Sequence, residues 1–179
     1  MRFLKTALIL MVVLQMAGQV FAQKRNSQWE LFAGGAVPLA PEFFKDFFEV
    51  GLSIHGQHVM FPSPKLGVSI GAAYETFTTK ISSNAKLEIG EVGVGLRPYL
   101  SSIESNLQIF LFGMATYDLL RVTAGSFEND EQKFGLAFGG GLEFPAGPRF
   151  NIILQAVARN IFTEDESTSF LGITGGLVF

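Results

Sequence analysis

Residues 133–144 read KFGLAFGGGLEF, and this segment says more about the fold than any other. Positions 134, 136, 138, 140, 142 and 144 hold Phe, Leu, Phe, Gly, Leu and Phe, whereas the alternate positions hold Lys133, three glycines, one alanine and Glu143. A two-residue period places alternate side chains on opposite faces of an extended strand. The segment therefore predicts a β-strand with one apolar face and one face of small and charged residues.

Seven more segments show the same two-residue period. Their alternate positions are apolar over residues 29–37, 50–54, 66–74, 92–96, 107–119, 150–158 and 171–179. Just before 92–96 the apolar phase changes near Gly90, because Leu87 and Ile89 fall on the opposite set. A β-bulge or an interior-facing extension of the strand would explain that change. The eight segments, with turn residues between them, predict one domain of eight antiparallel strands.

The expected connections between the strands alternate in length. Three are short, Pro62-Ser63-Pro64, residues 101–105 and residues 145–148, and four are mostly longer, residues 38–49, 79–85, 122–132 and 163–168. Outer-membrane barrels have short periplasmic turns and longer outer loops, and an even number of strands leaves both ends in the periplasm. The lengths therefore favour an all-β fold, a closed eight-stranded up-and-down transmembrane β-barrel.

Alternation alone does not say which face of the sheet points outward. A soluble periplasmic carrier with a lipocalin-like barrel would show the same pattern with its apolar residues inside. Here the less apolar set is poor in charge and rich in glycine and alanine, which suits the filling of a narrow barrel. Aromatic residues also gather near the strand ends, as interfacial girdles do: Tyr74, Tyr117, Phe134, Phe162 and Phe170 towards the outer rim, and Trp29, Tyr99, Phe144, Phe150 and Phe179 towards the periplasmic rim.

The first 22 residues have the pattern of a signal peptide. Arg2 and Lys5 provide a positive start, residues 7–17 are uncharged and mostly apolar, and Val20-Phe21-Ala22 ends on the small residue that a signal peptidase needs. The apolar run is short for a membrane span. We therefore expect a signal-peptide helix at 1–22, cleaved on export through the inner membrane, and one outer-membrane barrel domain at 23–179.

The composition excludes several classes of protein. The chain has no Cys, so disulfides, thiolate metal sites and a lipoprotein anchor are excluded. Without Arg2 and Lys5, 11 of the 13 basic residues remain against 16 acidic ones, a net charge of −5 that argues against nucleic-acid binding. No later stretch approaches 18 uninterrupted apolar residues, so no transmembrane helix is expected.

Four features together resemble the small outer-membrane β-barrel family of Gram-negative bacteria, the OmpA-barrel and OmpX type of the porin-like superfamily. They are the expected signal peptide, the eight alternating segments, Val37-Pro38 before a phenylalanine-rich loop, and the terminal Leu177-Val178-Phe179. The resemblance covers the whole mature chain. It implies insertion by the barrel-assembly machinery, which in this family reads a terminal aromatic residue, here Phe179 with Leu177. The glycine often found shortly before that residue is slightly out of register, at Gly175-Gly176.

Charged residues on the inward-facing set fall into two layers. Each layer holds both signs, because an unpaired charge inside a narrow barrel is very unfavourable. We predict a buried ion-pair network that plugs the barrel, with a gated proton or ion path as the alternative. Eight strands leave an interior that side chains just fill, so no open pore is expected. The outer layer contains Glu75, Glu91, Asp118, Lys133 and Arg159, and the periplasmic layer contains Glu30, Arg97 and Glu143.

Ser53 and His55, on the second segment together with His58, raise the possibility of a hydrolase. Nucleophilic catalysis needs a base within hydrogen-bond reach, an orienting group and an oxyanion donor. Next neighbours on one strand face lie about 7 Å apart, which is long for such a contact. Both residues are also assigned to the interior, away from a lipid substrate. We therefore expect polar filling, no enzyme and no catalytic residue.

Two expected outer loops carry acidic residues. Hard divalent cations bind such oxygen clusters, but the spacing matches no defined calcium loop. Solvated loop charge is the preferred interpretation, so neither a metal site nor a cofactor is predicted. The residues are Glu128, Asp130 and Glu131 in one loop, and Glu164, Asp165 and Glu166 in the other.

The first outer loop contains two pairs of phenylalanines, Phe43 and Phe44, then Phe47 and Phe48. Their i, i+4 spacing predicts a short amphipathic helical turn that lies on the membrane interface or caps the barrel mouth. Four freely exposed phenylalanines would promote association, so a partner-binding or adhesive surface is the alternative.

The leading functional hypothesis is a non-enzymatic barrel in the bacterial outer membrane, with a structural role or a loop-mediated interaction at the cell surface. The alternatives are a lipid-modifying outer-membrane enzyme and a soluble periplasmic carrier of the lipocalin type. The expected partners are outer-membrane lipid and, during insertion, the barrel-assembly machinery. We expect a monomer.

Overall fold

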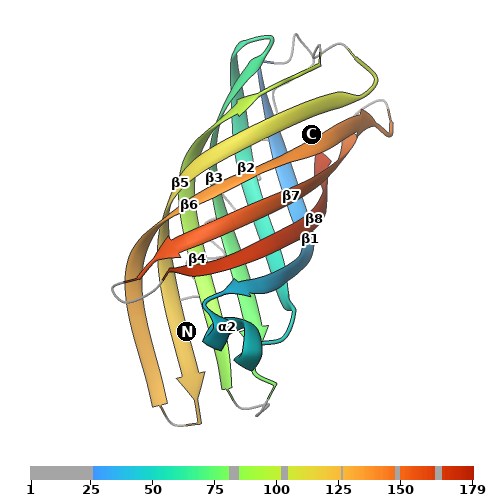
Figure 1. Ribbon diagram of the computed structural model, residues 1–179. Helices are drawn as coiled ribbons and strands as arrows, with labels where there is room; N and C mark the ends of the chain where they lie inside the picture. The colour runs from blue at the N-terminus through green and yellow to red at the C-terminus, as the bar shows by residue number, and fades with distance from the viewer. Residues whose placement is uncertain (1–25, 81–84, 102–104, 126, 148–149, 164–166) are drawn as a thin grey trace.

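The computed structural model describes residues 26–80, 85–101, 105–125, 127–147, 150–163 and 167–179. Within them, eight strands follow one another around a closed antiparallel barrel, and β8 pairs with β1 to complete it (Figure 1). A six-residue helix, α2 (Glu42–Phe47), follows β1. The predicted fold class is confirmed. The strands are β1 (Ser27–Ala40), β2 (Gly51–Ser63), β3 (Leu66–Thr78), β4 (Ala85–Pro98), β5 (Gln108–Ala124), β6 (Phe127–Pro145), β7 (Asn151–Phe162) and β8 (Thr168–Val178).

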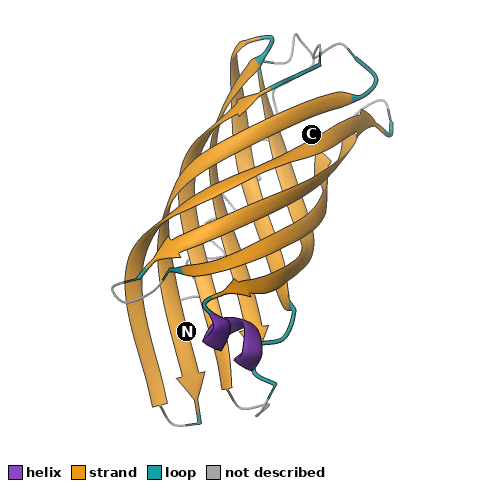
Figure 2. Cartoon of the chain, in the orientation of Figure 1, coloured by secondary structure: helices purple, strands orange, loops and turns teal. Residues whose placement is uncertain are grey.

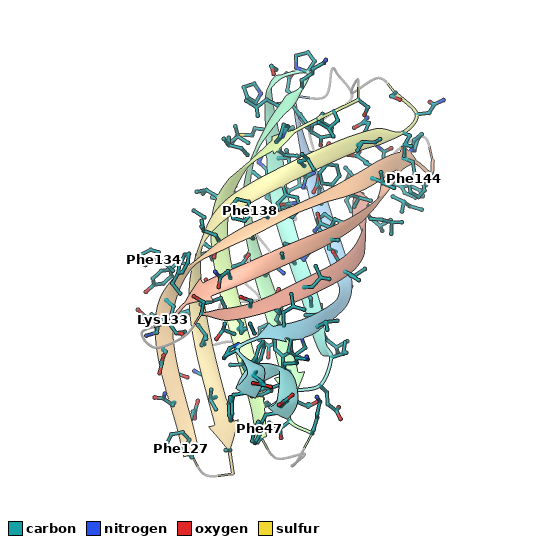
Figure 3. All side chains as sticks on the ribbon, in the orientation of Figure 1. Phe47, Phe127, Lys133, Phe134, Phe138 and Phe144 are labelled. Atoms are coloured by element: carbon teal, nitrogen blue, oxygen red, sulfur yellow. The ribbon has the colours of Figure 1, made fainter. Side chains whose placement is uncertain are left out.

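Side chains alternate between the outside and the inside of the barrel, and the apolar set lies outside. On β2, Leu52 and Ile54 are 67% and 61% exposed, whereas Ser53 between them is buried. On β6, Phe134 and Phe138 are exposed on the outer face, as Figure 3 shows. The orientation predicted from the sequence is therefore the one observed.

The two ends of the barrel differ (Figure 2). At the turn end, residues 64–65 join β2 to β3, and Val178 at the end of β8 pairs with Glu30 of β1. At the mouth end lie α2 and the tip of the β5–β6 hairpin, which extends past the end of β7.

The expected loop at 122–132 is wrong, because these residues belong to two strands. β5 and β6 remain paired up to Ala124 and Phe127, and the residues between them include Gly125 with a φ of 63°, in the left-handed region that glycine adopts readily. β6 pairs with β7 only as far as Phe134, so the hairpin protrudes past its neighbour. The outer parts of β5 and β6 lack an apolar face, and their pattern therefore resembles that of a loop.

The phase change near Gly90 comes from an interior-facing extension of β4. The pairing of β4 with β3 and with β5 runs through this region without a register shift. Leu87 and Ile89 are buried because they point into the mouth end of the barrel. The apolar set therefore changes sides where the strand leaves the apolar belt, and no bulge is needed.

Two of the ten expected girdle residues are inside the barrel. Tyr99 is buried and bridges to Phe110, and Phe170 is buried with its ring 5.4 Å from the ring of Phe77. Both follow the alternation of their own strands, since Leu171 faces outward next to Phe170. The alternation of inward and outward positions therefore predicts the side of an aromatic residue better than its nearness to a strand end does. In the described part of the chain, no helix is long and apolar enough to cross a membrane.

Candidate functional site

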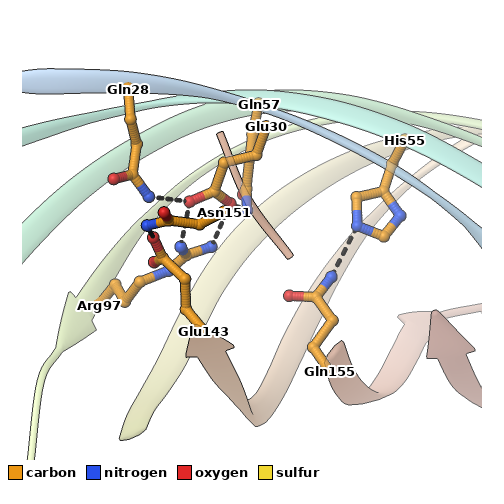
Figure 4. Close-up of polar contacts among 8 residues, drawn as sticks. All are labelled: Gln28, Glu30, His55, Gln57, Arg97, Glu143, Asn151 and Gln155. Atoms are coloured by element: carbon orange, nitrogen blue, oxygen red, sulfur yellow. Dashed lines mark hydrogen bonds and ion pairs between the residues drawn. The ribbon is translucent and has the colours of Figure 1, made fainter. Parts of the chain in front are cut away.

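The turn-end charge layer is built around the ion pair of Arg97 with Glu30 (Figure 4). The Arg97 Nη2 atom donates to Glu30 Oε2 at 2.8 Å, and Nη1 donates to Oε1. Gln57 Nε2 donates to the same carboxylate at 2.5 Å, and Gln28 donates to its other oxygen. The Arg97 guanidinium also lies 4.3 Å from the ring centre of Phe110, a cation–π contact. The buried charges are thus paired and hydrogen-bonded, as burial requires.

Glu143 completes this layer. Its side chain is buried, and its Oε1 accepts a hydrogen bond from Asn151 Nδ2 at 2.7 Å, as Figure 4 also shows. Glu30, Arg97 and Glu143 come from β1, β4 and β6, so the layer connects three widely separated strands. The structure therefore brings together the three residues that the sequence assigned to this end.

The mouth-end charge layer is built around Arg159 of β7. Arg159 Nη1 lies 3.0 Å from Glu75 Oε1, and Nε lies 2.9 Å from Glu91 Oε2. Ser53 Oγ donates to Glu75 at 3.1 Å. Arg159 and its two acidic partners are at most 6% exposed. One guanidinium therefore links β3, β4 and β7 across the interior.

Two further members of the predicted outer layer lie on β5 and β6. Asp118 is buried and accepts a hydrogen bond from Thr116 Oγ1 at 2.9 Å. Lys133 stands opposite Asp118 in the strand register, is partly buried, and places its Nζ 3.4 Å from Glu131 Oε2. All eight predicted interior charges are thus on inward-facing positions, seven of them buried.

Ser53 and His55 have different hydrogen-bond partners. Ser53 donates to Glu75, whereas His55 Nε2 lies 2.6 Å from Gln155 Nε2 of β7 and its ring stacks on Phe32 at 4.2 Å between centroids. This arrangement does not form the serine–histidine relay that a hydrolase would need. His58 lies on the outer face instead, with its ring 4.6 Å from that of Trp29. The cross-barrel partner Gln155 carried no sequence signal, because it is 100 residues from His55.

Two apolar clusters fill the rest of the interior, and the sequence indicated only part of one of them, through the interior-facing phase of Leu87 and Ile89 and the capping turn that holds Phe44 and Phe48. Each inward-facing aromatic residue is an isolated exception on a face of small and polar residues, so the alternation gave no warning of them. The inner cluster contains Phe32, Tyr99, Phe110, Phe112, Ala137, Ile153, Val157 and Val178. The mouth cluster contains Ala36, Phe44, Phe48, Phe77, Leu87, Ile89, Ile161 and Phe170.

A small cavity lies between the two clusters, and its wall includes Phe112, Ala137 and Val157 of the inner cluster. Its volume of about 20 Å³ for the centres of water-sized molecules holds one or two waters. Its lining includes His55, Gln57, Glu91, Gln155 and Arg159. Among the described residues, the interior therefore offers room for water and not for a larger ligand.

The four phenylalanines of the first outer loop divide into two pairs. Phe44 and Phe48 are buried in the mouth cluster, where the Phe44 ring lies 5.2 Å from that of Phe77. Phe43 and Phe47 are exposed, and their rings stack at 4.3 Å. α2 therefore caps the mouth with one stripe and presents the other to the surroundings.

The outer face of the protruding hairpin carries an ion-pair group. Arg121 donates through Nε and Nη2 to the two Asp130 oxygens at 2.8 and 2.9 Å, and Nε lies 3.1 Å from Glu128 Oε1. The hydrogen bonds from Arg121 lower the pKa of the Asp130 carboxyl. No cluster suited to a metal ion occurs among the described residues. The second acidic set, Glu164, Asp165 and Glu166, lies outside the described residues, as does the expected signal peptide.

The end of the chain closes the barrel seam. Trp29 N–H donates to the Phe179 carbonyl at 3.1 Å, and Phe179 N–H donates to the Trp29 carbonyl at 2.9 Å. Leu177 and Phe179 are both exposed on the outer surface. The two residues that the family resemblance singles out as an assembly signal thus lie beside the first strand.

No protein-family model and no curated protein matches the sequence. Solved structures do match the fold. Neisserial surface protein A superposes with a TM-score of 0.68 at 11% identity, covering 86% of this chain and 96% of its own. The N-terminal β-barrel domain of Pseudomonas aeruginosa OprF gives 0.57 at 13% identity, covering 88% and 100%. Ail, the attachment invasion locus protein of Yersinia pestis, gives 0.54 at 14% identity, covering 86% and 97%.

At such identities the likeness concerns the fold alone. It extends over nearly the whole of each matched chain and over the described barrel of this one. The strand number, the antiparallel order and the closed sheet agree with it. The chain therefore has the fold of the small eight-stranded outer-membrane β-barrels.

Proposed function

We propose that this chain is a non-enzymatic integral protein of the bacterial outer membrane, a sealed barrel that presents its mouth end at the cell surface. One observation carries the proposal: large apolar side chains cover the outside of the barrel, whereas paired charges are buried inside. Val94, Phe138 and Ile173, on three different strands, are 58%, 58% and 60% exposed. In water such a surface would drive association, whereas hydrocarbon accommodates it.

The position of outward-facing charges supports this orientation. On β4 and β5 the outer face is apolar at Val92 and Val94, and it becomes charged at Glu88, Lys86 and Arg121, close to the mouth end. Charged side chains need water, so the lipid boundary falls below these residues. Since such barrels have their short turns on the periplasmic side, we expect the turn end to face the periplasm and the mouth end to face the exterior.

The interior supports a sealed barrel over a pore or a carrier. A lipocalin-like carrier would keep a large apolar cavity for its ligand, but the cavity here is about 20 Å³, and charged groups such as Glu91 and Arg159 form part of its wall. The inner cluster and the mouth cluster lie on either side of it. An enzyme is disfavoured because Ser53 and His55 each bond a different partner.

The names of two similar structures favour a role at the surface. One is a Neisserial surface protein, and the other is an attachment invasion locus protein that has also been solved with the heparin analogue sucrose octasulfate. Those names concern these proteins, and the fold alone connects them with this chain. They support a role in interaction through the mouth end, which is also where the protruding hairpin and Phe43 are exposed.

The test is fractionation of cells that express the full chain, followed by electrophoresis of the detergent extract with and without boiling. We expect the protein in the outer-membrane fraction, with a band whose mobility changes on boiling because the closed barrel resists unfolding by detergent. Protease added to intact cells should cut within the β5–β6 hairpin. Recovery in osmotic-shock fluid, monodisperse without detergent, would refute membrane insertion.

A further inference from the structure

Asp118 of β5 is a carboxyl group that is fully buried in the mouth-end charge layer. Thr116 Oγ1 donates a hydrogen bond of 2.9 Å to its Oδ2, and among the described residues its other oxygen, Oδ1, has no hydrogen-bond partner. β6 contributes Gly135 beside it, where a side chain would collide with Oδ2. An ionised Asp118 would therefore be a buried charge held by one hydroxyl group, which is very unfavourable.

The neighbouring carboxyl groups already share the guanidinium of Arg159. Glu75 of β3 and Glu91 of β4 are buried, and they contact Arg159 of β7 at 3.0 and 2.9 Å. One positive charge thus faces two carboxylates before Asp118 is counted. A third ionised carboxyl group would leave a second buried negative charge without compensation.

Two further titratable groups face this layer, and acids remain in excess when both are considered. Lys133 of β6 stands opposite Asp118, but it is only partly buried and its Nζ lies 3.4 Å from Glu131 Oε2. Even with Lys133 counted, three buried carboxyl groups face two cations. His55 of β2 bonds to Gln155 of β7 rather than to Asp118. In the described parts of β1, β8 and α2, no titratable side chain faces this layer.

The strand register places a proton acceptor opposite Asp118. Glu91 is its partner across the β4–β5 pair, and both side chains point inward. Directly opposite residues have Cβ atoms about 4.5–5.5 Å apart, so two carboxyl groups in these positions can share one proton. A proton on Oδ1 makes Asp118 a donor at the oxygen that lacks a partner, while Oδ2 keeps its hydrogen bond from Thr116.

We propose that the mouth-end charge layer binds one proton at neutral pH, held on Oδ1 of Asp118 and shared with Glu91. Asp118 is then a neutral carboxylic acid, and the ionised Glu75 and Glu91 divide Arg159 between them. The inference goes beyond the proposed function, because it concerns the interior of the barrel and not its role at the cell surface.

This proton makes the stability of the barrel depend on pH. An aspartate in the unfolded chain is ionised above about pH 4, so the folded protein carries one proton more than the unfolded chain. The stability therefore falls as the pH rises, with the sign expected for a group that is protonated only in the folded state. Once the folded protein also loses the proton, an unpaired negative charge is left beside the mouth cluster.

The test is Asp118→Asn in the full mature barrel folded in detergent, because an amide resembles a neutral acid in shape and has no proton to lose. Urea unfolding compares the variant with the wild type between about pH 5 and pH 9, and every other titratable group is common to both. We expect the variant to be at least as stable as the wild type at neutral pH. The ratio of their two unfolding constants should change by about tenfold per pH unit in favour of the variant, until the wild type releases its proton.

Glu75→Gln is the matched control, because it makes the same chemical change on a carboxylate that is paired with Arg159. It should be less stable than the wild type at neutral pH. Asp118→Asn that is as unstable as Glu75→Gln would overturn the proposal, and so would a ratio of unfolding constants that stays constant across the pH range.

Infrared spectroscopy of the wild type tests the proton directly and does not require a variant to fold. Asp118 is the one buried aspartate among the described residues, so carbon-13 in the aspartate carboxyl groups labels it selectively within the interior. In a detergent without ester groups, we expect a carbonyl band of a protonated carboxylic acid at neutral pH that shifts with this label. The absence of such a band would overturn the proposal.

Discussion

Arg97 of β4 and Glu30 of β1 form a two-pronged ion pair across the barrel interior, although 67 residues separate them in the sequence. Both side chains are at most 1% exposed. Removing one partner leaves an uncompensated buried charge, so we expect Glu30→Leu or Arg97→Met alone to destabilise the barrel by about 3–5 kcal/mol. Unfolding in urea, followed by tryptophan fluorescence of the detergent-folded protein, measures this.

The double variant Glu30→Leu with Arg97→Met is the control. Because it removes both charges, we expect it to be more stable than either single variant, so that the coupling between the two substitutions exceeds about 3 kcal/mol, the loss expected from one of them alone. Additive losses in the double variant would mean that packing, rather than the ion pair, gives the two residues their importance.

Arg159 is expected to contribute to stability without controlling a pore. Arg159→Ala leaves Glu75 and Glu91 without their shared cation, so the thermal midpoint of the folded barrel should fall. The inner cluster and the mouth cluster remain in place on either side, so planar-bilayer recordings should show no stable channel. A steady single-channel current from the wild type would contradict a sealed interior.

Much of this site could be predicted because it depends on alternation. The inward position of Glu30, Arg97 and Glu143 follows from the parity of their neighbours, and parity does not depend on which strand lies opposite. The sequence does not predict which of these residues pair with one another. Arg97 could have been matched with Glu30 or with Glu143, and only the stagger of the closed sheet decides between them.

The differences between the sequence predictions and the structure have a common physical origin. The period-two signal is clear where one face meets lipid, and it fades where both faces of a strand meet water, as at Asp130. The sequence of the hairpin therefore resembles that of a loop. The sequence does not distinguish Phe44 and Phe48 from Phe43 and Phe47, because the i, i+4 spacing predicts two helical stripes but not which of them meets the barrel.

The lipid boundary can be mapped by introducing a lysine at two positions along the barrel wall, one in the middle of a strand and one near the mouth end. Val94 faces outward in the middle of β4, opposite Ile70 and Ala115, so Val94→Lys should destabilise the barrel by about 2–4 kcal/mol in lipid vesicles. Thr123 lies at the mouth end of β5, between Lys86 of β4 and Glu128 of β6, where Thr123→Lys should change stability by no more than about 0.5 kcal/mol. Equal losses of stability from both variants in urea titrations would contradict this position of the lipid boundary.

The protruding hairpin should lose order in acid. The ion pair with Arg121 holds the pKa of the Asp130 carboxyl below its ordinary value of 3.8. The stabilisation by this pair is therefore present above pH 3.8, and it is lost as the pH falls through the lower pKa of Asp130 in the folded protein. Hydrogen–deuterium exchange of residues 121–131 should therefore speed up, relative to the chemical rate, below about pH 4. Asp130→Asn should show the faster exchange at neutral pH as well, and high salt should reduce the difference because the pair is exposed. Protection that is unchanged down to pH 2 would mean that the pair does not hold the hairpin.

The cap formed by α2 offers a matched pair of substitutions. Phe44 is 3% exposed among the rings of the mouth cluster, whereas its neighbour Phe43 is 62% exposed. Phe44→Ala removes a buried ring and should destabilise the barrel by about 3–5 kcal/mol, because a cavity is left between Phe48 and Phe77. Phe43→Ala should change the free energy of unfolding by no more than about 0.5 kcal/mol, since its ring contacts mainly Phe47. Urea unfolding of both variants in the same detergent measures these changes. Similar losses of stability would mean that α2 contacts the barrel through both stripes. No loss from Phe44→Ala would mean that the helix does not close the mouth.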